Sequence, residues 1–178
     1  MHRLIVTGAN GAGKSHLARR LGALRPDVPV FSYDALRLTR NWIKRPHAET
    51  VAALTNDLAA PAWIFEGGPS LLRHALPLAD GLVWLDPPFL TRAWRLMARP
   101  WRNLGRTRPE LPPGNVDWPW QQYRFALRSL RRNALPHEEI TDRLAEAGHR
   151  PVWHCRTGRD VVAVERAWIE AGDRHVRP

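Results

Sequence analysis

A chain of 178 residues can bury the core of one domain, and 27 Lys and Arg against 17 Asp and Glu leave this one with a formal net charge of +10. That charge favours anionic partners, among them phosphates and nucleic acid. The lone cysteine, Cys155, excludes an internal disulfide framework, and no apolar run is long enough to span a membrane. We expect one cytoplasmic domain that acts as a monomer or a homodimer, without a membrane partner.

The predicted elements begin with a buried strand over residues 3–7, which a turn joins to a helix that runs to about residue 24. This turn matches the phosphate-binding pattern G-x-x-x-x-G-K-[ST] in full. Its residues are Gly8, Ala9, Asn10, Gly11, Ala12, Gly13, Lys14 and Ser15.

Glycine in this turn allows backbone N–H groups to point inward around a phosphate chain without Cβ clashes. The helix that follows, with His16 in its first turn, presents its positive dipole end to the same anion. We therefore expect the loop to bind ATP, Lys14 to contact the β- and γ-phosphates, and the Ser15 hydroxyl to hold Mg²⁺.

Four more apolar runs predict strands over residues 28–32, 62–65, 81–85 and 152–155. Helical patterns lie between the strands. The first covers residues 36–60, with an interruption near Arg45-Pro46, and two shorter helices are expected to begin at the N-caps Ser70 and Asp86. A longer helix is expected from Trp120 to Gly148 with a kink at Pro136, and a last one over 160–171. This alternation predicts an α/β fold in which helices cover both faces of a parallel sheet. Ligands of such sheets bind beyond the carboxyl ends of the strands, where we expect Gly8, Asp34, Glu66 and Asp86 to converge around one crevice.

Residues 104–119 follow neither a helical nor a strand period and are rich in proline, glycine and arginine. Long irregular loops inside compact domains are commonly functional. Because this one joins two arginine-bearing helices, we expect a mobile lid that brings Arg106 and Arg108 to a phosphate, with Arg99 from the preceding helix. The alternative for each arginine is a solvated surface position.

Several segments together carry a resemblance to a known family: residues 8–15, Tyr33-Asp34, Arg45-Pro46 with Glu49, residues 63–67, Arg73, residues 79–86, and residues 105–110. With them the chain resembles the adenylate-kinase-like P-loop kinases, and most closely the small FlaR-related family of DNA topology modulation proteins. The resemblance implies a three-layer P-loop NTPase sandwich with a five-stranded parallel sheet in the order 2-3-1-4-5. It also implies an acceptor-binding segment at about 35–60 and a lid at about 104–119.

The resemblance and the strand ends together suggest roles for individual residues. Asp34 is expected to act as the base or orienting group for the acceptor, although the residues alone leave a helix N-cap equally open. Glu66 is expected to hold Mg²⁺ through a water, at a strand end where relatives usually carry Asp-Gly-Asn. Arg45, Gly67 and Arg73 complete the expected acceptor contacts. Related kinases hold the adenine edge with backbone groups at the positions of Thr157, Gly158 and Arg159.

These assignments predict an ATP- and Mg²⁺-dependent kinase that transfers the γ-phosphoryl group to a small acceptor, with a nucleotide as one candidate. The alternative is an ATP-binding regulator that binds DNA or a partner protein, for which the net charge is the support. Neither the eight histidines nor the lone cysteine has the spacing of a zinc site.

Overall fold

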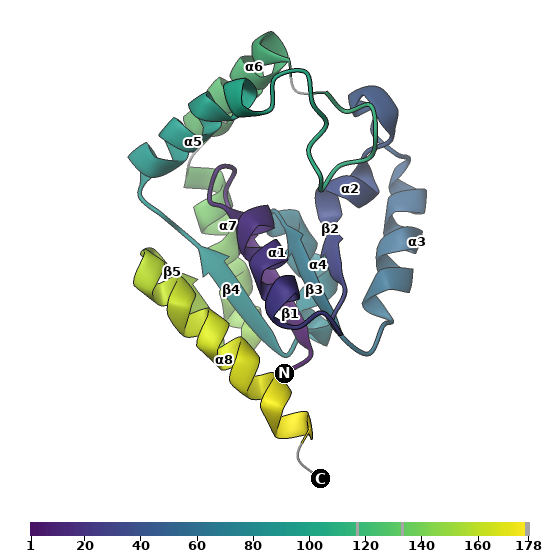
Figure 1. Cartoon of the computed structure of the whole chain (residues 1–178), viewed down its shortest axis with the longest axis vertical. Coiled ribbons are helices and arrows are strands. Elements are labelled where there is room, and N and C mark those ends of the chain that lie inside the picture. The colour runs from purple at the N-terminus through teal and green to yellow at the C-terminus, as the bar shows by residue number, and fades with distance from the viewer. Residues whose placement is uncertain (117, 133, 177–178) are drawn as a thin grey trace.

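The centre of the molecule is a five-stranded parallel sheet in the order β2-β3-β1-β4-β5 (Figure 1). The computed structural model describes residues 1–116, 118–132 and 134–176. Its strands are β1 Arg3–Gly8, β2 Val30–Ser32, β3 Trp63–Gly67, β4 Gly81–Leu85 and β5 Val152–Cys155. The predicted α/β class, the parallel pairing and the strand order are confirmed.

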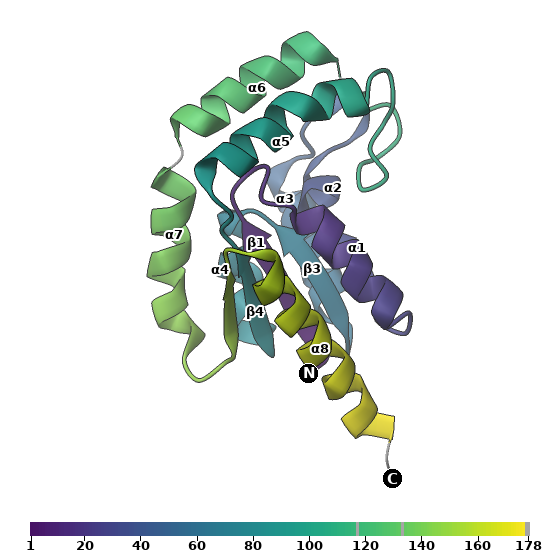
Figure 2. The same cartoon turned by 60° about the vertical axis from the view of Figure 1, so that its left-hand side comes forward.

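One face of the sheet is covered by α1 (Lys14–Leu24) and α8 (Gly158–Val176), which lie side by side in Figure 2. Their apolar side chains pack on Leu4 and Val6 of β1 and on Val83 of β4, all of them fully buried. Alternate residues of a strand point to opposite faces, so this layer takes every second residue of β1.

The opposite face of the sheet is covered by the other helices of the core, α3 (His47–Leu58), α4 (Leu72–Ala75) and α7 (Ala134–Leu144). They pack on the remaining residues of the central strands, among them Ile5 and Phe65. Because both faces are covered, β3 and β4 are buried along their whole length, which explains why their sequences show no polar alternation.

Above the carboxyl ends of the strands, α5 (Phe89–Arg102) and α6 (Pro119–Arg131) form a helical hairpin (Figure 2). The connection between them is the predicted lid, of which Asp117 lies outside the described residues. It is irregular, as expected, apart from one antiparallel bridge between Thr107 and Val116. The lid turns back towards the short helix α2 (Tyr33–Arg37) (Figure 1).

The single helix predicted from Trp120 to Gly148 is two helices, and Pro136 is not the place of the break. Helix α6 ends at Arg131 and α7 begins at Ala134, while Asn133 lies outside the described residues. Pro136 is in the first turn of α7, where backbone N–H groups have no partner within the helix and a missing N–H costs nothing.

Two predicted helix caps are also wrong. Ser70 lies inside a 3₁₀ turn, Pro69–Leu71, that is preceded by Gly68 as its N-cap. Asp86 does not cap α5, whose N-cap is Pro88. The Asp86 carboxylate instead lies 3.0 Å from Nε2 of His154 on β5, a partner that only the pairing of β4 with β5 brings close.

Trp168 attaches α8 to α1, and we expect its removal to destabilise the whole fold. Its indole is fully buried, donates a hydrogen bond to the Leu21 carbonyl at 3.0 Å, and carries the Arg25 guanidinium 4.3 Å above its ring. Trp168→Ala should lower the free energy of unfolding by about 3–5 kcal/mol in urea denaturation. Trp94→Ala, at a position 68% exposed, is the control and should change it by less than about 0.5 kcal/mol. Equal effects of the two changes would contradict this account.

Candidate active site

The phosphate-binding loop joins β1 to α1, and its glycines meet two separate constraints. At Gly8, φ is 147° and a Cβ would lie 2.3 Å from the carbonyl oxygen of Leu85. Gly11 and Gly13 have φ values of 80° and 105°, in the left-handed region that residues with side chains rarely adopt. The loop is therefore held against β4 and leads into the N-terminal end of α1, where an anion is favoured.

Lys14 is the first residue of α1, and its Nζ donates a hydrogen bond to the Ala9 carbonyl at 3.2 Å across the loop. Burial lowers the pKa of Lys14, and the carboxylates of Glu66 and Asp34 oppose that shift. The ammonium group thus lies between the phosphate-binding loop and two carboxylates, that of Glu66 on β3 and that of Asp34 in the first turn of α2.

Glu66 lies near the end of β3 and is 4% exposed. Burial raises the pKa of Glu66, while the ammonium of Lys14 and hydrogen bonds from Ser32 and Ser15 oppose the rise. The Ser32 hydroxyl donates to Oε1 of Glu66 at 2.6 Å. Sequence reasoning missed Ser32, since its contact with Glu66 arises only where β2 pairs with β3.

This group of oxygens fits a magnesium ion that is shared with phosphates. Mg²⁺ keeps several waters and takes few protein ligands when it is bound beside a phosphate chain. The hydroxyl of Ser15 and the carboxylate of Glu66, which interact with each other, supply such oxygens. Among the described residues, no three His, Cys, Asp or Glu side chains are arranged to enclose a metal ion by themselves.

A cavity of about 790 Å³ extends from the phosphate-binding loop to the start of α8. This volume is within the usual range for small-molecule sites. The predicted residues that line it are Gly11, Ala12, Gly13, Lys14, Ser15, His16, Arg99, Arg108, Thr157 and Gly158. Away from the loop the walls include apolar groups of Leu85, Pro87 and Val161, which suit the base of a nucleotide better than its phosphates.

Three arginines of α5 lie beside the phosphate-binding loop. Arg92 Nε donates to the Asn10 carbonyl at 3.2 Å, and Arg95 Nη1 donates to the Ala12 carbonyl at 2.9 Å. Arg99 Nη2 donates to Oε1 of Gln122 on α6 at 3.1 Å. Their i, i+3, i+7 spacing puts them on one helix face, a signal in the sequence from which Arg92 and Arg95 could have been assigned.

The two predicted lid arginines take different positions. Arg108 lines the cavity, lies 3.7 Å from Glu110, and places its guanidinium 5.5 Å from the ring centre of Trp42. Arg106 is exposed and does not line the cavity; its backbone N–H donates to the Asn103 carbonyl at 2.9 Å. The structure therefore brings only one of the two to the site.

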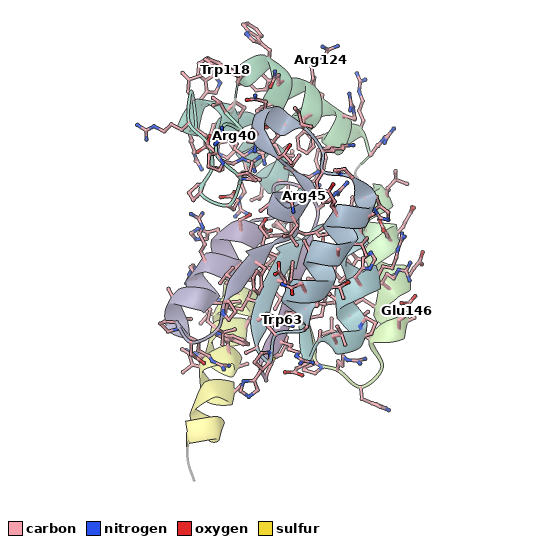
Figure 3. The ribbon with its side chains drawn as sticks, turned by 90° about the vertical axis from the view of Figure 1, so that its right-hand side faces the viewer. Arg40, Arg45, Trp63, Trp118, Arg124 and Glu146 are labelled. Carbon is pink, nitrogen blue, oxygen red and sulfur yellow. The ribbon has the colours of Figure 1, made fainter. Side chains whose placement is uncertain are left out.

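The predicted acceptor residues lie on several elements, and of these residues Asp34 and Glu66 interact with Lys14. Asp34 is exposed in the first turn of α2, whose N-cap is Ser32, so the alternative of a capping Asp34 is wrong. Arg45 is half-buried just before α3, and its place relative to the lid is visible in Figure 3. Arg73 is exposed on α4. Gly67 is needed for close packing, because a Cβ there would lie 2.9 Å from Cβ of Tyr33.

The turn before α8 is held by one carboxylate. Oδ2 of Asp160 accepts hydrogen bonds from the backbone N–H groups of Arg156 and Thr157, at 2.9 and 2.7 Å, and from the Thr157 hydroxyl at 2.9 Å. These hydrogen bonds lower the pKa of Asp160. The predicted Arg159 is exposed and does not line the cavity. Asp160 therefore fixes the turn that forms the far end of the cavity.

Comparisons with known proteins identify the fold. No protein-family model matches the sequence, and a search of curated proteins found no significant match. Among solved structures, TT1252 from Thermus thermophilus is 18% identical with a TM-score of 0.56, each chain being covered completely. Shikimate kinase from Bacteroides thetaiotaomicron is 16% identical, with a TM-score of 0.54 over 97% of this chain and 98% of that one. A gluconokinase from Sinorhizobium meliloti is 16% identical, with a TM-score of 0.50 over 99% and 98%. The chain has the fold of the adenylate-kinase-like P-loop kinases.

Proposed function

We propose that the protein is an ATP- and Mg²⁺-dependent phosphotransferase that acts on a small acceptor. The observation that carries this proposal is the position of the Lys14 ammonium. It lies at the phosphate end of the 790 Å³ cavity and interacts with Glu66 and Asp34 on the acceptor side. A γ-phosphoryl group bound there would have the donor site behind it and two carboxylates in front of it.

Each residue of the site has a separate role in the proposed phosphoryl transfer. Lys14 and the loop N–H groups bind the phosphates, and Mg²⁺, held through Ser15 and Glu66, would neutralise charge on the β- and γ-oxygens. Asp34 orients the acceptor hydroxyl and takes its proton. The guanidinium groups of Arg99 and Arg108 stabilise the charge that spreads over the transferring group, in a site from which the lid excludes water.

The acceptor class follows from the residues on the α2 side of the site. Arg45 and Arg73 suit an anionic acceptor. The fold neighbours include kinases named for shikimate and gluconate, both hydroxy acids, so hydroxy acids belong in a test beside nucleotides. The FlaR-related assignment, which rests on residues 79–86 and 105–110, is part of the same proposal.

A cytoplasmic location is also proposed, because the proposed donor is ATP and the single cysteine, Cys155, leaves no disulfide framework within the chain. Within the described ranges, no helix has both the length and the apolar character needed to cross a membrane.

Lys14→Ala should lower the turnover of Mg·ATP by about 10²-fold or more, because one charge-stabilising donor at a transferring group is worth that much. The measurement is ADP release in the presence of nucleoside monophosphates, nucleosides, sugars and hydroxy acids. Arg166→Ala is the control, since Arg166 is an exposed cation on α8 that does not line the cavity. Turnover by Lys14→Ala at the wild-type rate would contradict the assignment.

The pH dependence of stability should report the burial of Glu66. Its pKa is higher in the folded chain than in the unfolded chain, so the stability associated with its neutral form is complete below about pH 4.3 and is lost as pH rises through the raised value. Without ligands, Glu66→Gln should therefore become more stable relative to wild type between pH 4 and pH 8 in urea denaturation. Glu49→Gln, at an exposed position, should follow the wild-type profile. Parallel profiles for all three proteins would contradict the burial of a charged Glu66.

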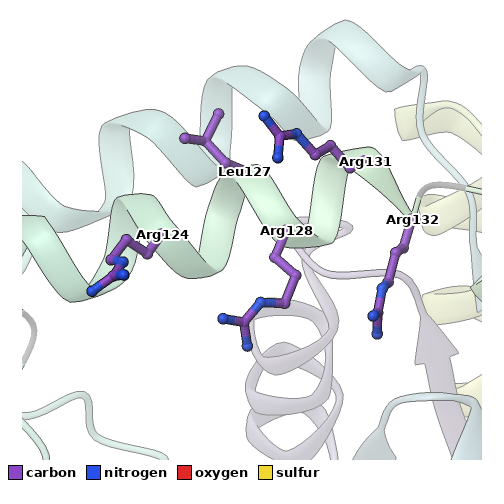
Figure 4. Close-up of a pocket in the computed structure, with 5 residues that line it drawn as sticks. All are labelled: Arg124, Leu127, Arg128, Arg131 and Arg132. Atoms are coloured by element: carbon purple, nitrogen blue, oxygen red, sulfur yellow. The ribbon is translucent and has the colours of Figure 1, made fainter.

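A second candidate function, an ATP-binding regulator that binds DNA, is favoured by the outer surface of α6. Arg124, Arg128, Arg131 and Arg132 line a hollow of about 410 Å³ there, and Figure 4 shows three of them, Arg124, Arg128 and Arg132, projecting from the same side of the helix. None of the four makes an ion pair with any residue that the structure describes. Like charges at i, i+4 destabilise a helix unless an anion lies against them.

Exposed aromatic rings on the same helix add a second feature of single-stranded nucleic-acid binders. Trp120 and Phe125 are exposed, as is Trp118 at the N-cap of α6. Aromatic platforms beside a row of arginines bind bases by stacking and the backbone by charge. α6 contains no acidic residue that would repel a phosphate backbone.

Binding of a single-stranded oligodeoxynucleotide should weaken steeply with salt, and Arg124→Gln/Arg128→Gln should reduce the slope of log K against log [salt] by about 1.4. Fluorescence anisotropy over a series of salt concentrations measures it. Arg143→Gln/Arg166→Gln removes the same charge elsewhere and should leave the slope unchanged. No binding at low salt, or equal slopes for both double variants, would exclude this second function.

A further inference from the structure

Asn115 in the lid is fully buried against the acceptor-binding segment, although it belongs to an irregular loop. Its Oδ1 accepts a hydrogen bond from the backbone N–H of Trp42 at 2.5 Å. Its Nδ2 donates to the carbonyl of Thr39 and to the carbonyl of Pro112 in the lid itself, both at 2.8 Å. One side-chain amide thus uses both donors and its acceptor to join residues 39–42 to the lid.

Three further contacts hold the same two segments together. The indole Nε1 of Trp42 donates to the carbonyl of Val116 at 3.0 Å. Gly114, with φ of 88°, lies close to Arg40 and Asn41, since a Cβ added to it would be 3.6 Å from a side-chain atom of each. The Arg108 guanidinium lies over the Trp42 ring. Figure 3 shows Arg40 beside the lid, away from the sheet.

The backbone of the acceptor-binding segment is strained at the point of contact. Asn41 and Trp42 have φ values of 57° and 59°, and neither is a glycine. Two successive side-chain-bearing residues in the left-handed region persist only where surrounding contacts hold them. In this turn the backbone N–H of Trp42 donates a hydrogen bond to Oδ1 of Asn115. The lid therefore stabilises a conformation that the segment does not favour by itself.

We propose that the lid and the acceptor-binding segment close as one body, latched by Asn115, and that Asn115 is a positioning residue that places Arg108 at the phosphate end of the nucleotide cavity. This inference rests on the proposed kinase function. Trp42 is the link, because its backbone N–H bonds to Asn115 while its ring supports the Arg108 guanidinium. A ligand that orders either segment orders the other, so nucleotide and acceptor must strengthen each other's binding.

The first test measures the latch in the protein without any acceptor. The bond after Arg106 is exposed in the lid, whereas the bond after Arg108 precedes a proline and resists trypsin. Asn115→Ala should increase the rate of cleavage after Arg106 at least tenfold and weaken the binding of Mg·ADP, measured by calorimetry, by about fivefold or more. Glu139→Ala, at an exposed position on α7 outside the lid and the acceptor-binding segment, is the control and should change neither quantity.

A double-mutant cycle separates positioning from general stability. If Asn115 acts through Arg108, Asn115→Ala should weaken Mg·ADP binding in the wild-type background and have no further effect in Arg108→Ala. Additive effects would overturn the proposal. Trp42→Phe keeps the ring beneath Arg108 but removes the bond to Val116, so it should raise the cleavage rate with a smaller change in nucleotide affinity. This variant also tests the latch if Asn115→Ala does not fold.

The outcomes distinguish this inference from the proposed function. A wild-type protein that binds no Mg·ADP would refute the nucleotide site, and with it the positioning role. Mg·ADP binding by the wild type, with cleavage and affinity unchanged in Asn115→Ala, would refute the latch and leave the kinase proposal intact. Faster cleavage with unchanged affinity would refute the positioning of Arg108.

Discussion

The interaction of the half-buried Lys14 with the buried carboxylate of Glu66 is the one on which the rest of this structure depends. Lys14 lies at the start of α1, which the loop connects to β1, and Glu66 lies on β3, so the pair exists only when β1 and β3 are in register. Burial disfavours the charged form of both groups, and the charge of each opposes the pKa shift that burial causes in the other. In the proposed function, a phosphate chain with a divalent cation would supply the counter-charges that both groups need.

The same electrostatic requirement explains the unusual orientation of α5. A surface helix normally buries its apolar stripe and exposes its charges. In α5 the arginines Arg92 and Arg99 face the phosphate-binding loop or α6, while Leu90, Trp94 and Trp101 are exposed. The helix lies over an anion-binding loop, so its cationic face is the one that belongs inside.

In the closed arrangement that we propose, contacts between two irregular segments hold the lid. A lid must leave and return, so its attachments cannot have the extent of a hydrophobic core. Here they consist of one saturated asparagine amide, one indole N–H and one stacked guanidinium. The strained turn at Asn41 and Trp42 raises the free energy of the closed arrangement, so this turn should relax when the contacts with the lid are lost.

The sheet and the phosphate-binding loop could be predicted from the sequence, because both follow from local patterns. The pattern from Gly8 to Ser15 is read within eight residues, and short apolar runs mark all five strands. Even the residues expected at strand ends, Glu66 among them, follow from the rule that parallel strands end at one edge.

Contacts between side chains that are distant in the sequence could not be predicted, because they depend on the tertiary structure. Ser32 reaches Glu66 through strand pairing, and Asn115 reaches Trp42 across 73 positions of the chain. No local period encodes such contacts, and an asparagine in a Pro- and Gly-rich loop looks like any turn residue. Arg106 and Arg108, equivalent in the sequence, were separated because only the second lies against the Trp42 ring. Burial and hydrogen bonding between distant segments, which arise only on folding, decide which of the many arginines line the cavity.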